Sequence, residues 1–99
     1  MLLIEGTVRI PSENVAAARS AMAAVLAASR AEDGCIAYAY AEDVLVPGLI
    51  HIAERWRDEA ALKAHFAQPH MAEWRATWSS LGITDRDLRL YEVGEPRPV

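Results

Sequence analysis

The sequence predicts an α+β fold in which six elements follow one another in the order β-α-β-β-α-β. Three observations support this order. Apolar residues alternate with a period of two near both ends of the chain. The same alternation flanks a Pro-Gly turn in the middle of the chain, and apolar residues recur at helical spacing in the two segments between. We therefore expect a four-stranded antiparallel sheet with two helices on one face.

The first strand is expected over Leu2–Ile10, where apolar side chains at even positions alternate with polar ones. Pro11 ends this strand, and Ser12 is placed to cap the amide groups of a following helix. That helix is predicted from about Glu13 to Glu32 because it is rich in alanine, the strongest helix former. Gly34 follows as its left-handed C-terminal stop.

A hairpin comes next, with strands over Cys35–Val44 and Leu49–Trp56. The segment Val46–Leu49 favours a type II turn, since proline presets the first central residue and glycine adopts positive φ at the second.

The two faces of this hairpin differ in character. One face of its first strand should carry Ile36, Tyr38 and Tyr40, and the other should carry Cys35 with three alanines. The small, largely uncharged face would be an exposed apolar patch in a monomer. A second copy could cover it, so we expect a homodimer formed through the sheet faces.

The second helical segment begins after Asp58, a favourable N-cap residue. Its apolar edge is interrupted at Pro69, so we expect one broken helix that is kinked or restarts there. Gly82 ends it. A last strand is predicted over Leu88–Val93, and residues 94–99 form an extended tail.

Composition excludes several classes of function. Of the 99 residues, 53% are apolar, which suits one domain over residues 1–99, although nineteen of them are alanine. The net charge is −4 and there is no basic stripe, which argues against binding to nucleic acid or to an anionic membrane.

No segment has the pattern of a signal peptide or a membrane span. Cys35 is the only cysteine, so a cytoplasmic protein is expected.

Four short motifs occur in order along the chain: GCIAY at 34–38, ERWRDEAALKAH at 54–65, PH at 69–70 and LYEV at 90–93. Together they resemble the antibiotic biosynthesis monooxygenase domain family over about residues 2–93. The resemblance implies a ferredoxin-like protomer in a dimeric α/β barrel, with an apolar pocket between the sheet and the second helix.

The resemblance also implies an activity. Members of this family include oxygenases that oxidise quinols or polycyclic phenols with dioxygen and without a metal or flavin. We therefore expect a cofactor-independent monooxygenase acting on a small phenolic, quinol or polycyclic aromatic compound. Three alternatives stay open: a haem-binding or haem-degrading protein, a non-catalytic small-molecule-binding or stress-response module, and a small-metabolite isomerase.

The candidate catalytic residues are His65 as a base, Glu54 as its orienting partner and Trp56 as a residue that stacks on a planar substrate. A structural histidine and a tryptophan that only packs between strand and helix are the alternatives. The expected pocket residues share an aromatic or bulky apolar side chain: Tyr38, Ile52, Phe66, Met71, Trp74 and Trp78.

The other histidines are assigned lesser roles. His70 follows the helix break, where a lone histidine more often faces solvent than binds a metal or haem, and His51 is expected at the dimer interface. The three histidines lack the spacing of a metal site on one helix, so neither a metal nor a cofactor is expected. Asn14 is the only asparagine and lies far from the site, so the asparagine-based mechanism of the polyketide-oxidising members does not transfer as a whole.

Overall fold

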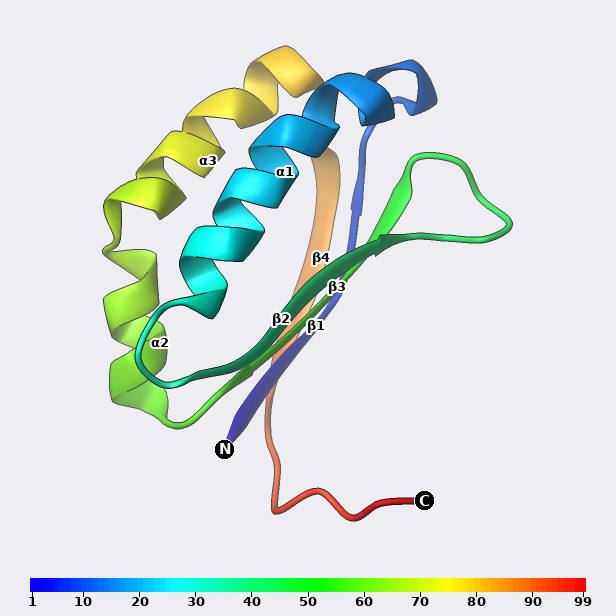
Figure 1. Ribbon diagram of the computed structural model, residues 1–99. Coiled ribbons are helices and arrows are strands. Elements are labelled where there is room, and N and C mark those ends of the chain that lie inside the picture. Colours follow the sequence, from blue (N-terminus) through cyan, green and yellow to red (C-terminus); the bar gives the residue numbers. More distant parts are fainter.

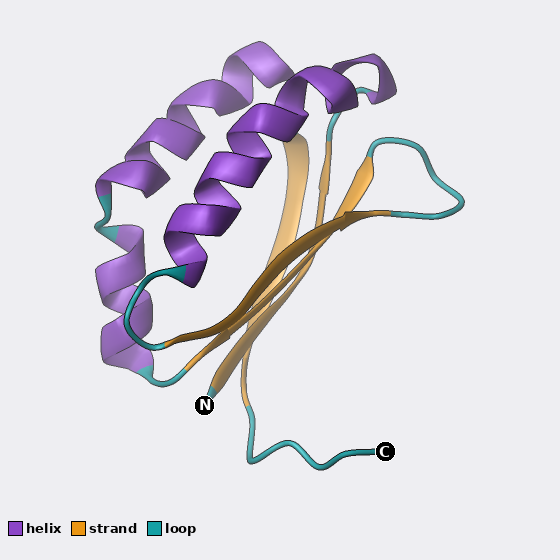
Figure 2. Cartoon of the chain, in the orientation of Figure 1, coloured by secondary structure: helices purple, strands orange, loops and turns teal.

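The computed structural model describes residues 1–99. In chain order its elements are β1 (Leu2–Arg9), the 3₁₀ turn η1 (Ser12–Asn14), α1 (Val15–Arg30), β2 (Cys35–Glu42), β3 (Leu49–Trp56), α2 (Glu59–Phe66), α3 (Pro69–Leu81) and β4 (Thr84–Glu92). The four strands form one antiparallel sheet in the order β2-β3-β1-β4. All three helices lie on one face of it (Figures 1 and 2). The predicted ferredoxin-like α+β fold is confirmed, and no helix is long and apolar enough to cross a membrane.

The first helix is shorter at both ends than the sequence predicted. Its N-terminus is preceded by a 3₁₀ turn in which the Asn14 amide donates to the Pro11 carbonyl. A backbone carbonyl therefore accepts this amide, and the expected cap by the Ser12 side chain is not formed. At the other end α1 stops at Arg30, and residues 31–34 form a turn. Gly34 closes this turn at φ 84° instead of ending the helix itself. Glu32 consequently lies outside the helix.

The second strand contains a bulge that the alternation of side chains could not reveal. Cys35 pairs with Trp56, whereas Ala37 pairs with Arg55, so one extra residue lies between them on β2. The prediction for Ile36 and Cys35 is therefore wrong, because the extra residue exchanges their faces. Ile36 is half exposed, while Cys35 packs against the core around Trp56.

The second helical segment is divided as the sequence indicated. The Asp58 carboxylate accepts the Ala61 amide at 2.9 Å and caps α2. Pro69 is the first residue of α3, where its missing N–H has no consequence for the helix. The chain therefore restarts a helix there, and α2 and α3 follow one another along the sheet (Figure 1).

The last strand begins four residues earlier than predicted, at Thr84. A register shift between Thr7 and Arg9 accompanies this start, and Asp85 has φ 54°. Irregular backbone of this kind leaves no period-two signal in the sequence. The strand's first residues reach the space between the sheet and α3, which matters for the site below.

The core lies between the helices and one face of the sheet. Its buried members on the sheet alternate along the two central strands, as the period of two requires. They are Leu2, Ile4 and Val8 on β1 and Ile50, Ile52, Glu54 and Trp56 on β3. Two of these, Glu54 and Trp56, adjoin His65 of α2, which is also fully buried. The polar groups of the core are thus concentrated at one end.

The hairpin turn has the predicted type II geometry. Gly48 has φ 81°, and the Leu49 amide donates to the Val46 carbonyl at 3.2 Å. A Cβ atom at Gly48 would lie 2.1 Å from the Ile10 carbonyl oxygen, which is closer than a real Cβ atom can approach. Both the backbone angle and the available space therefore require glycine.

We expect Gly48→Ala to destabilise the protein by at least about 2 kcal/mol, because left-handed backbone strain and the contact with Ile10 act together. Urea unfolding monitored by circular dichroism measures the change. Gly94→Ala is the matched control, since nothing lies within 4 Å of a Cβ atom at that position. Equal stability of the two variants would contradict the role given to Gly48.

Candidate functional site

A mainly apolar cavity of about 110 Å³ lies between the sheet and helices α2 and α3. Eleven of its sixteen lining residues are hydrophobic. All six residues expected from the sequence to form a pocket line it: Tyr38, Ile52, Phe66, Met71, Trp74 and Trp78. Glu54 and His65 line it as well, but Trp56 does not. The cavity is therefore a hydrophobic space with a few polar groups at defined positions, as is usual for small-molecule sites.

The imidazole of His65 is completely buried, and its two nitrogens have different surroundings. Nδ1 lies 2.6 Å from Oε2 of Glu32, whereas Nε2 has no hydrogen-bond partner. A carboxylate accepts hydrogen bonds, so Nδ1 donates and the lone pair is on Nε2. Burial lowers the pKa of His65, and the hydrogen bond to Glu32 opposes that shift. The neutral ring is thus a proton acceptor beside an apolar cavity.

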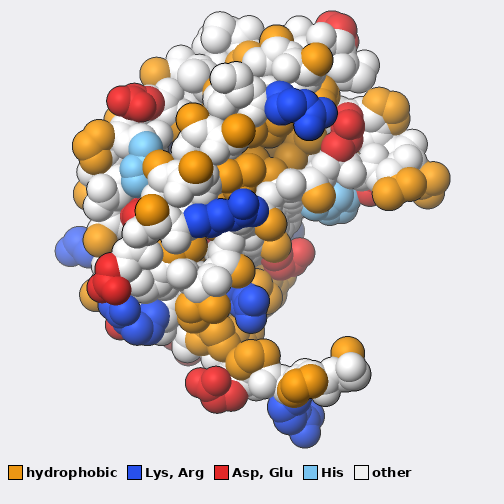
Figure 3. Space-filling model, viewed as in Figure 1, with side chains coloured by type: hydrophobic (Ala, Val, Ile, Leu, Met, Phe, Trp, Pro, Cys, Tyr) orange, Lys and Arg blue, Asp and Glu red, His pale blue; other side chains and the backbone are white.

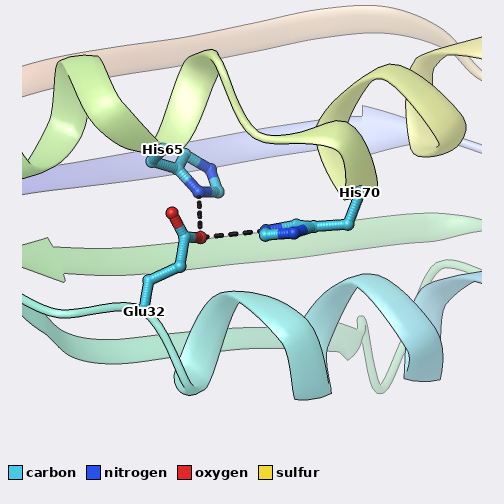
Figure 4. A group of neighbouring side chains, drawn as sticks. All are labelled: Glu32, His65 and His70. Carbon is cyan, nitrogen blue, oxygen red and sulfur yellow. Dashed lines mark hydrogen bonds and ion pairs between the residues drawn. The ribbon is translucent and has the colours of Figure 1, made fainter.

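The partner of His65 is not the one predicted from the sequence. Glu32 approaches it from the turn between α1 and β2, as Figure 4 shows. Glu54 instead accepts a hydrogen bond from Nε1 of Trp56 at 2.9 Å. The error has a definite origin, because the first helix was expected to continue through Glu32. As the last residue of a helix, Glu32 would be expected at a solvent-exposed helix end and not beside His65.

Trp56 supports His65 from the side of the sheet. It has no exposed surface, and its ring centroid lies 4.5 Å from that of His65. The Tyr38 ring packs in an edge-on, T-shaped arrangement against the rings of Trp56 and His65. Trp56 does not line the cavity, whereas His65 does, so the packing alternative describes the tryptophan in this arrangement. It orients the imidazole and Glu54 instead.

Three further polar groups lie at the cavity. Glu54 is 5% exposed, and burial raises the pKa of its carboxyl group, with the Trp56 N–H and the Arg86 charge acting in the opposite direction. The hydroxyls of Tyr38 and Tyr40 are 3.1 Å apart. Burial raises the pKa of Tyr40 to about 12 and that of Tyr38 further above its ordinary value. Both tyrosines are therefore neutral hydrogen-bonding groups near pH 7.

Arg86 is a second residue, besides Glu32, that sequence reasoning missed. It is the only lysine or arginine among the lining residues. Its guanidinium carbon lies 5.2 Å from the ring centroid of Trp78, and it takes part in none of the ion pairs of the structure. The nearby Nε1 of Trp78 is a buried donor without a partner. Because the last strand was predicted to begin only at Leu88, the sequence offered no reason to place Arg86 at the cavity.

The remaining histidines lie in different environments. His70 is one-fifth exposed, and its Nε2 is 3.0 Å from Oε2 of Glu32, so the prediction that it faces solvent is wrong. Glu32, His65 and His70 thus form a cluster of potential metal ligands, whereas the sequence had assigned none. His51 lies on the outer face of the sheet and contacts Asp43 at 2.7 Å.

Comparison with known proteins identifies one family. The model of the antibiotic biosynthesis monooxygenase family matches residues 1–77. An uncharacterised protein of Synechocystis sp., sll1783, is 33% identical over 67 residues, which are 68% of this chain and 46% of that protein. The chain therefore spans about half the length of this curated relative.

Solved structures agree with this result. A Deinococcus radiodurans protein provisionally named an antibiotic biosynthesis monooxygenase has a TM-score of 0.91 and 31% identity, covering 100% of this chain and 98% of that one. Rv0793 from Mycobacterium tuberculosis has a TM-score of 0.76 and 25% identity, with 98% and 96% covered. A conserved protein from Methanosarcina mazei has a TM-score of 0.81 at 21% identity, with 91% and 89% covered, which supports the fold alone.

The buried carboxyl group of Glu54 generates a prediction about stability and pH. Its pKa in the folded state is raised above the ordinary 4.5, so the protonated form is favoured by folding. That stabilisation is complete below the ordinary pKa and is lost as the pH rises through the folded-state value. Glu54→Gln keeps an acceptor for Trp56 and removes the charge. We expect it to raise stability at pH 7 by about 1 kcal/mol, or about 4–8 °C in Tm.

Thermal unfolding at pH 4 and pH 7 measures this difference. At pH 4 the variant and the parent should unfold at nearly the same temperature, because the glutamate is then largely neutral. Glu95→Gln in the exposed tail is the control and should change neither temperature. A Glu54→Gln variant that is less stable than the parent at pH 7 would show that the carboxylate is stabilising.

Proposed function

The chain belongs to the antibiotic biosynthesis monooxygenase family, and on this premise we propose that it is a cofactor-independent monooxygenase that oxidises a small phenol or quinol with dioxygen. The observation that carries the proposal is the unpartnered lone pair of the buried His65 Nε2, in a residue that lines an apolar cavity. A base in that position removes a phenolic proton at the point where the aromatic ring is bound.

The proposed reaction begins with proton transfer from the phenol to Nε2 of His65. Glu32 stabilises the resulting imidazolium through its hydrogen bond to Nδ1. The electron-rich phenolate then transfers electrons to dioxygen. A ring carbon bonds to one of the two oxygen atoms, which gives a peroxide anion attached to the ring. The imidazolium returns its proton to the peroxide. Loss of the ring C–H proton and cleavage of the O–O bond leave a carbonyl and release water.

This sequence balances without an external reductant. The substrate loses two hydrogens and gains one oxygen atom, while the second oxygen of dioxygen leaves as water. Both electrons that reduce that oxygen come from the substrate. The chain must therefore supply only a base, an apolar enclosure and stabilisation of negative charge. Arg86 supports the last of these, because its guanidinium has no carboxylate partner and lies at the cavity.

The size of the cavity favours a substrate with one ring. An apolar cavity of about 150 Å³ accommodates benzene, and the present one has a volume of about 110 Å³. Phe66 lines the cavity and is 45% exposed, so a change of its rotamer would alter the space available to the ring. A single phenolic ring fits this space more readily than a polycyclic compound or a haem.

We also propose that the protein is a homodimer joined through the outer faces of its sheets. Alanines occupy this face on β2 and β3, where Ala39 pairs with Ala53, so a second backbone could approach closely. The loop between these strands carries Val44 and Leu45, which are 97% and 87% exposed. Figure 3 shows hydrophobic atoms on this projecting loop. A partner at the sheet would give the loop an apolar surface to pack on.

Oxygen uptake tests the proposed reaction directly. We expect the parent protein to consume dioxygen with one-ring quinols, and His65→Ala to lose at least about 100-fold in rate, as is typical for removal of a general base. Lys63→Ala removes an exposed side chain from the same helix, outside the cavity, and is the control. A chelator should not lower the rate. Ligand binding without oxygen uptake would instead indicate a binding module, and a Soret band on haem titration would indicate a haem protein.

Light scattering of the purified protein tests the dimer. The parent should have twice the mass of one chain, and Ala39→Arg should convert it to a monomer because a bulky charge would enter the centre of the contact. Ala72→Arg, which places the same side chain on the exposed surface of α3, should stay dimeric. A monomeric parent, or a dimer that tolerates Ala39→Arg, would contradict the proposed interface.

A further inference from the structure

The cluster of Glu32, His65 and His70 adjoins the apolar cavity through His65 alone, because neither Glu32 nor His70 lines that cavity. Its members come from the turn after α1, from α2 and from the first turn of α3, and they converge as Figure 4 shows. Their ligand atoms all lie within 4.8 Å of one another. We propose that these three residues bind a divalent transition-metal ion, with Zn²⁺ as the representative, through Nδ1 of His65, Nε2 of His70 and the carboxylate of Glu32.

The chemistry of the donors suits such an ion. Two imidazole nitrogens and one carboxylate oxygen are common ligands of Zn²⁺, and a three-residue set leaves a position for water. Glu32 is 11% exposed, and its only ion-pair partners are the two histidines. A buried carboxylate without a lysine or arginine partner is costly. A divalent cation would provide the positive charge that this carboxylate lacks.

The distances define how far the cluster must adjust. Ligands bound tetrahedrally at about 2.0–2.1 Å are about 3.3 Å from each other. Oε2 of Glu32 is now 2.6 Å from His65 and 3.0 Å from His70, which are hydrogen-bond distances. The carboxylate must move outward by several tenths of an ångström, and the two imidazole nitrogens, which lie within 4.8 Å of one another, must adjust to the same spacing. Glu32 can make this movement because it lies in the turn at residues 31–34 and not within a helix.

The ion also has a route to the site. Glu32 and His70 line an open surface cavity of about 460 Å³ between α1, α2 and α3, to which Gln68 also contributes. His65 lines the separate apolar cavity and is not among the residues of this one. The exposed fraction of the side chains rises from 0% at His65 to 11% at Glu32 and 20% at His70. The proposed site is therefore reached from solvent without passing through the substrate cavity.

Direct titration of the metal tests the proposal. The untagged full chain is stripped of metal, and Zn²⁺ is added in a calorimeter, with Co²⁺ used in parallel to report ligand geometry from its visible absorption. We expect one ion to bind per chain. Glu32→Gln and His70→Ala should each weaken binding by at least about tenfold. Circular dichroism checks that each variant is folded, and His70→Ala changes a partly exposed side chain.

Glu13→Gln is the control, because it removes an exposed carboxylate in the 3₁₀ turn η1, outside both the cluster and the proposed dimer interface. It should bind Zn²⁺ as the parent does. Absence of saturable one-to-one binding, unchanged affinity in both cluster variants, or loss of binding in Glu13→Gln would each overturn the proposal. The titration needs no substrate, so its result is independent of whether the oxygenase activity is found.

Discussion

The hydrogen bond between His65 and Glu32 is the interaction on which the rest of the site depends. It joins α2 to the turn after α1, and it is made by a ring with no exposed surface. A hydrogen bond to a charged group contributes about 1.5–3 kcal/mol, and loss of Glu32 would leave the buried Nδ1 of His65 without this partner. The pair also determines which nitrogen of the ring carries the proton. A single contact thus links the packing of the helices to the chemistry available at the cavity.

Local features of the chain make this contact possible. Termination of α1 at Arg30 frees Glu32 to turn toward the sheet, and the Arg30 side chain itself donates to the Tyr38 carbonyl at 2.8 Å. The bulge in β2 keeps Tyr38 on the inner face, where its ring meets those of Trp56 and His65. Without the extra residue, regular alternation would place Ile36 on the same face as Tyr38 and Cys35 on the opposite face. The imidazole is therefore held by side chains from the turn and from two strands.

The elements of the fold could be predicted because their signals are local. The period of two in Leu2–Ile10, the cap at Asp58 and the proline at the start of α3 each act within a few residues. The cavity residues on α2 and α3 followed from the same periodicity. The partner of His65 could not be predicted, because Glu32 is 33 residues away and its orientation depends on where a helix ends. Arg86 was missed for a related reason, since an irregular start to β4 places it at the cavity.

The two proposals use opposite nitrogens of one ring, and this separates them physically. Nε2 is buried without a partner in a residue that lines a mainly hydrophobic cavity, where burial favours the neutral base. Nδ1 faces Glu32 and His70, whose exposed edges belong to a surface cavity. A metal ion at Nδ1 would take the place of the proton and draw electron density from the ring, so Nε2 would become a weaker base. Occupancy of the surface site would thereby reduce catalysis in the apolar cavity although the ion never enters it.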